Sequence, residues 1–154
     1  MKGGNVMKVK DCMCEEVCSI RPENTLRDVA KIMSEKHIGC MPVCDDNNCV
    51  CGIITDRDLV LRGIACNKDI NNTKVSDIMT CNVCSCKESD DITNAETKMG
   101  QKQIRRLPVC DDKNHVVGIL TLGDLAKKDN NISMEQICST LEDICDCNGN
   151  QNNQ

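Results

Sequence analysis

Residues 41–59 read MPVCDDNNCVCGIITDRDL, and residues 107–125 read LPVCDDKNHVVGILTLGDL. Aligning Val9 with Val75 gives an offset of 66 residues that holds without a gap over residues 9–59 and 75–125. Identical residues recur at this offset at Asp11/Asp77, Met13/Met79, Val17/Val83, Cys18/Cys84, Ser19/Ser85, Met33/Met99, Ile38/Ile104, Pro42/Pro108, Gly52/Gly118, Thr55/Thr121 and Asp58/Asp124. Two copies are too few for an open solenoid, and they predict a closed pair related by a pseudo-two-fold axis.

Each copy begins with a short apolar segment and a helical pattern. Residues 17–20 and 83–86 are typical of short strands. Behind an Asn/Thr cap, apolar residues then recur at helical spacing in the first copy, at Leu26, Val29, Ala30 and Met33, and Gly39 closes this helix. The second copy has a weaker pattern, capped by Asp90 or Asp91, at Ile92, Ala95 and Met99.

Each copy continues with a β-hairpin and a closing helix. Strands are predicted at residues 40–44 and 106–110, turns at 45–48 and 111–114, and further strands at 49–55 and 115–121. A helix follows from Asp56 to about Arg62, and from Leu122 to about Lys128. The order β-α-β-β-α predicts an α/β (α+β) unit that is too small to be stable alone. Two copies that bury one face against each other therefore explain the repetition.

The predicted domains are residues 1–66, with an N-terminal lead-in, and residues 67–128. A C-terminal amphipathic helix is predicted at 129–146, with a disordered tail at 147–154. Ser133 and Gln136 form the pattern of a capping box at the start of this helix. Its apolar stripe consists of Met134, Ile137, Cys138, Leu141, Ile144 and Cys145. A helix of this length is marginal in water, so we expect it to dock on the repeat or on a second subunit.

The composition excludes several classes of function. A formal net charge of −5 argues against nucleic acid as the main partner. No segment resembles a signal peptide or a membrane span, and we expect a cytoplasmic protein that does not bind membranes. The chain has 15 cysteines, an odd number without the spacing of a disulfide framework. We interpret them mainly as small core residues in a reducing compartment.

The duplicated pattern resembles the cystathionine-β-synthase-type (CBS) domain, and the pair resembles a free-standing tandem CBS module. The resemblance covers residues 9–125 and is strongest in the MPV/LPV strands and in GIITDRD and GILTLGD. It implies two β-α-β-β-α CBS repeats that bind an adenine nucleotide or S-adenosylmethionine in clefts between the domains. It also implies a homodimer and a regulatory role, with no cofactor required.

The Thr-x-x-Asp ending of each copy has two interpretations. The structural one is a capping box. In it the Thr hydroxyl accepts a hydrogen bond from a free backbone N–H of the helix, and the acidic side chain accepts one from the backbone N–H of the Thr. The functional one places a phosphate at the helix N-terminus, with Thr55 or Thr121 adding a donor. Asp58 or Asp124 then accepts both hydroxyls of a ribose, and the preceding glycine allows a close approach of the backbone.

The family resemblance implies further ligand contacts around these motifs. In the first copy they map to Ser19, Ile20, Pro22, Cys40, Met41 and Pro42. In the second copy they map to Ser85, Cys86, Arg106, Leu107 and Pro108, and Glu88 stands in place of Pro22. The chain has no aromatic residue, so adenine would lie between aliphatic and sulfur-containing side chains.

The two predicted sites differ in their cations. Arg105 and Arg106 could pair with phosphates in the second copy, where the first copy has Gly39 and Cys40. Arg57 stands between Thr55 and Asp58, where the second copy has Gly123. The alternative for each arginine is a solvated surface charge.

A zinc- or thiol-responsive sensor on the same scaffold remains an alternative, as does a structural dimerisation module with vestigial clefts. Cys81 and Cys84 form one CxxC pattern, with Cys86 nearby and Cys12 and Cys14 ahead of the matching place in the first copy. A structural zinc site needs four ligands, and neither a second CxxC nor a histidine pair is present. No catalytic motif is visible either, so we expect ligand binding without catalysis.

Overall fold

The structure, a computed structural model, describes residues 6–127 and 132–146. Its contacts divide the chain into two compact units. The first-copy unit comprises Cys18–Val83 and Lys113–Val116. The second-copy unit takes its described residues from Met1–Val17, Cys84–Asp112 and Val117–Gln154. Each unit is a mixed α+β structure, in agreement with the predicted fold class.

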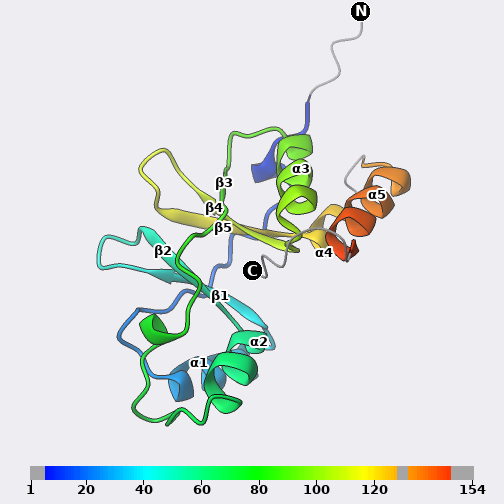
Figure 1. Cartoon of the computed structure of the whole chain (residues 1–154). Coiled ribbons are helices and arrows are strands. Elements are labelled where there is room, and N and C mark those ends of the chain that lie inside the picture. The colour runs from blue at the N-terminus through cyan, green and yellow to red at the C-terminus, as the bar shows by residue number, and fades with distance from the viewer. Residues whose placement is uncertain (1–5, 128–131, 147–154) are drawn as a thin grey trace, which may run out of the picture. The chain divides into compact units, whose positions relative to one another are not determined.

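The first-copy unit is built around one β-hairpin (Figure 1). Strands β1 and β2 pair antiparallel, and Ile20 adds a single parallel bridge to Val43 of β1. Ile20 is therefore the one residue of the strand predicted at 17–20 that pairs with β1. The elements in chain order are α1 (Leu26–Lys36), β1 (Cys40–Cys44), β2 (Val50–Thr55), α2 (Asp56–Asp58), the π-helical segment η2 (Leu59–Ile64) and the 3-10 segment η3 (Val75–Asp77).

The second-copy unit repeats this plan and adds a C-terminal helix. Its sheet has the order β3-β4-β5, with β3 parallel to β4. The predicted strand at 83–86 is shifted, since pairing begins only at Cys86. The elements are η1 (Val9–Asp11), β3 (Cys86–Lys87), α3 (Ile92–Lys102), β4 (Arg106–Cys110), β5 (Val116–Thr121), α4 (Leu122–Leu125) and α5 (Met134–Cys145).

Equivalent residues of the two copies form the two cores. Leu26, Val29 and Met33 of α1 face the first core, as their helical spacing predicts. Ile92, Ala95 and Met99 of α3 occupy the matching places in the second core. Helix α1 ends earlier than predicted, at His37, which takes the left-handed conformation with φ 54° in place of Gly39.

The lead-in to each copy packs in the other copy's unit. Val9 donates to Asp90 O at 3.0 Å in the second-copy unit, whereas Val75 donates to Asn24 O at 2.8 Å in the first-copy unit. The same exchange recurs further along, where Cys14 pairs with Ile119 and Thr80 pairs with Ile53. The boundaries at 66 and 128 remain predictions about the repeat. In the structure, the described residues 6–17 group with the second copy rather than with the first.

The C-terminal helix packs against α3 within the second-copy unit (Figure 1). Its predicted capping box is confirmed, since Gln136 N donates to Ser133 Oγ at 3.2 Å. The predicted apolar contact face is only partly right. Ile144 is buried, but Met134 and Leu141 are 72% and 41% exposed. The tail predicted at 147–154 lies outside the described residues.

Candidate functional site

The Thr-x-x-Asp motif of the first copy lies where the hairpin ends and α2 begins. Cys40 pairs with Thr55 at the end of the two strands, and Asp56 N donates to Gly39 O at 3.0 Å. These contacts fix the turn from β2 into α2. Thr55 and Asp58 are only 8% and 9% exposed, so the motif lies at the edge of the core rather than in a solvated loop.

Within this motif, Thr55 and Asp58 form a complete capping box. The backbone N–H and the hydroxyl of Thr55 both donate to Asp58 Oδ2, at 2.9 Å each. Asp58 N in turn donates to Thr55 Oγ1 at 3.2 Å. The structural interpretation of the motif is therefore confirmed, and Oδ2 of the aspartate is occupied by it.

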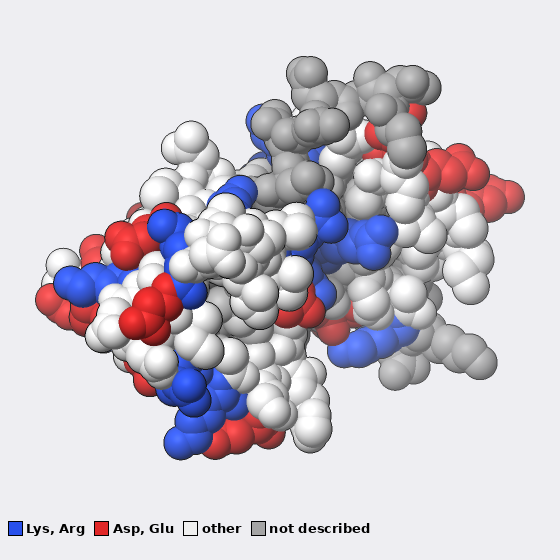
Figure 2. Space-filling model, turned by 60° about the horizontal axis from the view of Figure 1, so that its bottom comes forward, with Lys and Arg blue, Asp and Glu red and all other residues white. Residues whose placement is uncertain are grey.

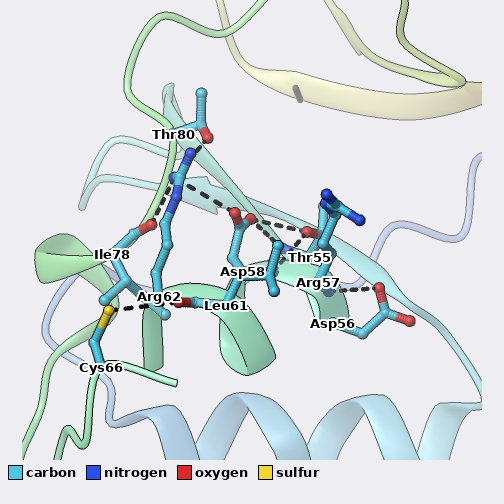
Figure 3. A network of polar contacts seen from close by, with 9 residues as sticks. All are labelled: Thr55, Asp56, Arg57, Asp58, Leu61, Arg62, Cys66, Ile78 and Thr80. Atoms are coloured by element: carbon cyan, nitrogen blue, oxygen red, sulfur yellow. Dashed lines mark hydrogen bonds and ion pairs between the residues drawn. The ribbon is translucent and has the colours of Figure 1, made fainter. Parts of the chain in front are cut away.

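The outer oxygen of Asp58 faces an arginine (Figure 3). Arg62 Nη1 lies 3.4 Å from Asp58 Oδ1, and it donates to Ile78 O at 3.0 Å and to Thr80 Oγ1 at 3.1 Å. Arg62 thus connects the aspartate to the exchanged lead-in segment. The 3.4 Å separation is long for a charge-assisted hydrogen bond, so Oδ1 keeps acceptor capacity for another donor.

The second-copy unit reproduces the capping box with a different cation. The N–H and hydroxyl of Thr121 donate to Asp124 Oδ2 at 2.9 and 2.7 Å, and Asp124 N donates to Thr121 Oγ1 at 3.1 Å. Lys127 Nζ donates to Asp124 Oδ1 at 2.7 Å, a shorter contact than the one from Arg62 in the first copy. The outer oxygen of Asp124 is therefore held more tightly.

The carboxyl of Asp124 is tuned by opposing effects. Burial alone would raise its pKa, but the hydrogen bonds from Lys127 and Thr121 outweigh burial and hold the pKa below its ordinary value. Lys127 responds reciprocally, since its hydrogen bond to Asp124 raises the pKa of the ammonium group. The second site therefore presents a carboxylate over the physiological pH range.

Two parts of the functional interpretation of the motif lose support. Helix α4 contains only four residues, so the dipole effect expected at its N-terminus is weak, whereas α2 continues into η2 and the backbone is helical from Asp56 to Ile64. The glycines of the motif do not leave room for a ligand. A Cβ on Gly52 would overlap Met79, and one on Gly118 would overlap Met13. The carboxylates of the two motifs remain groups suited to a ligand.

The other predicted contact residues surround these carboxylates unevenly. In the first-copy unit Ser19 is exposed, Pro22 is half-buried, and Ile20, Cys40, Met41 and Pro42 are buried. In the second-copy unit Ser85 is half-buried, and Cys86, Leu107 and Pro108 are buried. Met41 and Leu107 are 0% exposed and belong to the two cores, so only their backbone atoms are placed to contact a ligand.

The predicted arginines lie at the surface. Arg57 and Arg105 are exposed, and Arg106 is half-buried at the start of β4. Arg105 Nη2 lies 3.9 Å from Cys145 Sγ of α5. Leu122 N donates to Arg105 O at 2.9 Å, which matches the contact between Asp56 and Gly39 in the first copy.

Sequence reasoning did not find Arg62, Lys127 and Thr80. A signal for the first two was present, since cations three or four residues after an aspartate on a helix are placed to pair with it. The role of Thr80 had no local signal, because it depends on the exchanged lead-in segment. In the view of Figure 2, cations and anions are interspersed and form no extended basic face.

The cysteines are distributed more widely than core packing requires. Of the fourteen in the described residues, Cys12, Cys40, Cys44, Cys86 and Cys110 are buried, and the others are partly or fully exposed. The interpretation of cysteines as mainly core residues is therefore right for only part of the set. Within the described residues, no group of three or more His, Cys, Asp or Glu is arranged to hold a metal ion.

The fold and the duplicated motif define a pair of small α+β modules, and comparison with known proteins identifies the family. The profile of the CBS domain matches residues 9–63 and 75–131. The chain belongs to the CBS domain family and carries the domain twice.

Among its relatives is the CBS domain-containing protein YhcV of Bacillus subtilis, 38% identical over 136 residues. The alignment covers 88% of this chain and 94% of YhcV, so that relative consists of little beyond the CBS pair.

Two solved structures indicate the range of ligands in similar proteins. The CBS domain pair of protein MJ0100, in complex with 5-methylthioadenosine and S-adenosyl-L-methionine, has a TM-score of 0.71 and 30% identity, and the match covers 79% of this chain and 94% of that one. Hypoxic Response Protein I with two coordinated zinc ions has a TM-score of 0.73 and 30% identity, covering 79% and 98%. Hypoxic response protein 1 of Mycobacterium tuberculosis is 30% identical over 118 residues, which are 77% of this chain and 82% of that protein.

Proposed function

We propose that the protein is a non-enzymatic regulatory module of the cytoplasm that senses adenosine-containing ligands, either adenine nucleotides or S-adenosylmethionine. Each unit would bind the ligand's ribose at the outer oxygen of its aspartate, Asp58 or Asp124. We propose that the other residues predicted above around each motif make the remaining contacts with the ligand. The adenosyl ligands in the structure of MJ0100 support this class of ligand.

One observation carries the proposal. Both copies bury the same carboxylate against a Thr hydroxyl and direct its Oδ1 toward the flexible side chain of a cation, Arg62 or Lys127. A carboxylate held in this way offers acceptors at fixed positions to a donor pair such as the two hydroxyls of ribose.

The mechanism would be a shift in population. A ribose hydroxyl that donates to Asp58 Oδ1 competes with Arg62, which also contacts Ile78 and Thr80. Binding would therefore change how firmly the exchanged segment is held in the first-copy unit. Ligand can shift this equilibrium only by its differential affinity for the two states.

The test is calorimetric titration of AMP, ATP, S-adenosylmethionine and 5-methylthioadenosine into the wild-type chain and into Asp58→Asn and Asp124→Asn. Each substitution removes the charge with little change of shape. We expect each to weaken binding at one site by roughly tenfold or more, since a hydrogen bond to a charged acceptor contributes about 1.5–3 kcal/mol.

The chain offers a matched control at the start of α1. Thr25 and Asp28 form the same capping box, with Thr25 N donating to Asp28 Oδ2 at 2.8 Å and Asp28 N donating to Thr25 Oγ1 at 3.2 Å. Asp28→Asn should lower stability by about 1 kcal/mol and leave ligand affinity unchanged. Wild-type protein that binds none of the ligands, or aspartate variants that bind as Asp28→Asn does, would contradict the proposal.

A zinc-responsive function is the second candidate, and the zinc-bound structure of Hypoxic Response Protein I favours it. The described residues hold no ready cluster of ligands. We therefore expect the purified, reduced chain to carry no stoichiometric zinc and to stay folded in excess chelator. Metal analysis that finds zinc at one or two equivalents per chain, lost together with folding on chelation, would favour the zinc sensor instead.

We further propose that the chain forms a homodimer through η2. Val60, Leu61 and Ile64 of this segment are 52%, 47% and 63% exposed, an unusual concentration of large apolar side chains on a short helix. Leu61→Glu should reduce the mass in solution from a dimer to a monomer while the far-ultraviolet circular dichroism stays unchanged. A wild-type monomer, or a variant that remains dimeric, would contradict this assignment.

A further inference from the structure

Helices α3 and α5 enclose a polar groove of about 390 Å³ in the second-copy unit. Every side chain that lines it is polar, including Glu96 and Thr97 of α3 and Ser139, Thr140 and Asp143 of α5. Two of the lining residues are carboxylates and none is basic. The groove is therefore acidic, although it lies where two helices of a small domain would ordinarily bury apolar side chains.

The groove is a consequence of how α5 docks. Gly100, one turn after Glu96, allows the close approach of Asp143, because a Cβ there would stand only 3.0 Å from Asp143 Oδ2. Gln103 Nε2 then donates to Asp143 O at 3.3 Å and to Asp146 O at 2.6 Å, which fixes the end of α5. The helix is held at this end and turns a polar face toward α3.

One carboxylate oxygen of Glu96 is buried without a hydrogen-bond partner among the described residues. This oxygen is Oε1, and the residue as a whole is only 7% exposed. Burial raises the pKa of this carboxyl. A buried acceptor without a donor costs about 1–3 kcal/mol, and more when the group is charged. Such a group is uncommon in a folded protein, and a ligand that donates a hydrogen bond to it would remove this cost.

We propose that this groove binds a small aliphatic amine, whose ammonium group donates to Glu96 and whose second donor reaches Asp143. The hydroxyls of Thr97, Ser139 and Thr140 would accept the remaining N–H groups. No residue of the two Thr-x-x-Asp motifs lines this groove, and the proposal does not depend on the function proposed for them.

The chemistry of the groove excludes other classes of ligand. Two carboxylates without a neighbouring cation in the lining repel phosphates and carboxylates, and the polar lining offers little to an apolar molecule. A single metal ion is disfavoured because no cluster of three or more suitable ligands exists in the described residues. The volume falls within the range of small-molecule sites, which starts at about 300 Å³.

The test is calorimetric titration of 1,4-diaminobutane into the full chain at pH 8 and constant ionic strength. We expect one saturable site per chain. Glu96→Gln keeps the size of the side chain and removes its charge, and it should weaken binding at least tenfold. Glu142→Gln is the control, since Glu142 is exposed on α5 beside the groove-lining Asp143 and does not itself line the groove, and it should bind as the wild type does.

Tetramethylammonium separates recognition from simple charge attraction, because it carries the same charge on each nitrogen but no N–H donor. It should give no saturable heat. The proposal is overturned if wild type shows no saturable binding of diaminobutane, if Glu96→Gln binds as tightly as wild type, or if tetramethylammonium binds equally well.

Circular dichroism will show whether Glu96→Gln is folded, and Asp143→Asn provides a second variant with the same expected direction if it is not. Titrations of Glu96→Gln with adenosine-containing ligands should match those of the wild type. A failure of the amine-binding proposal is therefore distinguishable from a failure of the proposed function.

Discussion

The side chain of Met79 lies over Gly52, at the place that a Cβ would occupy, and Met13 lies over Gly118 in the same way. Both methionines come from lead-in segments that pack in the other copy's unit. The glycine of each Gly-x-x-Thr motif therefore makes room for the exchanged segment. In this protein it is a packing residue that keeps the lead-in against the strand carrying the site.

Gly52→Ala should destabilise the protein by about 1–3 kcal/mol, because the new methyl group overlaps Met79 in a packed environment. Chemical denaturation followed by circular dichroism measures the loss. Adding Met79→Ala should recover part of it, since the overlap is then removed.

Gly123→Ala is the control for this substitution. A Cβ there would stand 3.6 Å from Thr121 Oγ1, an ordinary contact, so stability should be unchanged or up to about 1 kcal/mol higher in α4. Equal losses at Gly52 and Gly123 would show that the methionine contact is not the cause.

The capping box of Asp124 should make stability depend on acid pH. Its pKa is lower in the folded protein than in the unfolded chain, so the stabilisation is complete above the unfolded value and disappears as pH falls through the folded value. Relative to Asp124→Asn, wild type should therefore be more stable at pH 7 and lose this advantage below about pH 4.

Denaturation curves from pH 7 to pH 3 measure the difference. Asp46→Asn is the control, because the side chain of Asp46 is 98% exposed and the substitution should leave the curves unchanged. An advantage over Asp124→Asn that does not change with pH would show that the carboxylate charge is not responsible.

Ile144 should account for most of the apolar contribution to the docking of α5. It is 9% exposed in the core of the second-copy unit, so Ile144→Ala should cost about 2 kcal/mol or more. Met134→Ala, at a residue that is 72% exposed, should change stability by less than about 0.5 kcal/mol. Similar effects for both substitutions would mean that α5 docks through another face.

Cys86 should resist alkylation in the native protein. Burial, the main cause, raises the pKa of its thiol to about 12 from 9.0. Because the thiolate is the reactive form, iodoacetamide at pH 8 should modify Cys86 at least about a hundredfold more slowly than an ordinary thiol.

Peptide mass spectrometry over a time course gives the rates, with exposed Cys138 as the reference. In urea the two cysteines should react at similar rates. Equal rates in the native protein would contradict the burial of Cys86.

The sequence by itself determined the repeat, the order of elements and the capping boxes. These features follow from local rules: apolar periodicity places Leu26, Val29 and Met33 on one face, and a hydroxyl with an acid three residues later caps a helix. The boxes at Thr55 and Ser133 could therefore be predicted correctly. The family followed from the same residues, because its most specific motifs are short and lie within each copy.

Only the tertiary structure decided which residues these locally determined elements contact. The exchange of the lead-in segments, the contact between Arg62 and Thr80, and the burial of Glu96 without a partner all join residues far apart in the chain or on different helices. The orientation of α5 was also beyond the sequence, which showed an apolar stripe but not that Thr140 would be buried and Met134 exposed. Periodicity shows which residues of an element share a face, whereas the surface that covers this face depends on how the whole chain packs.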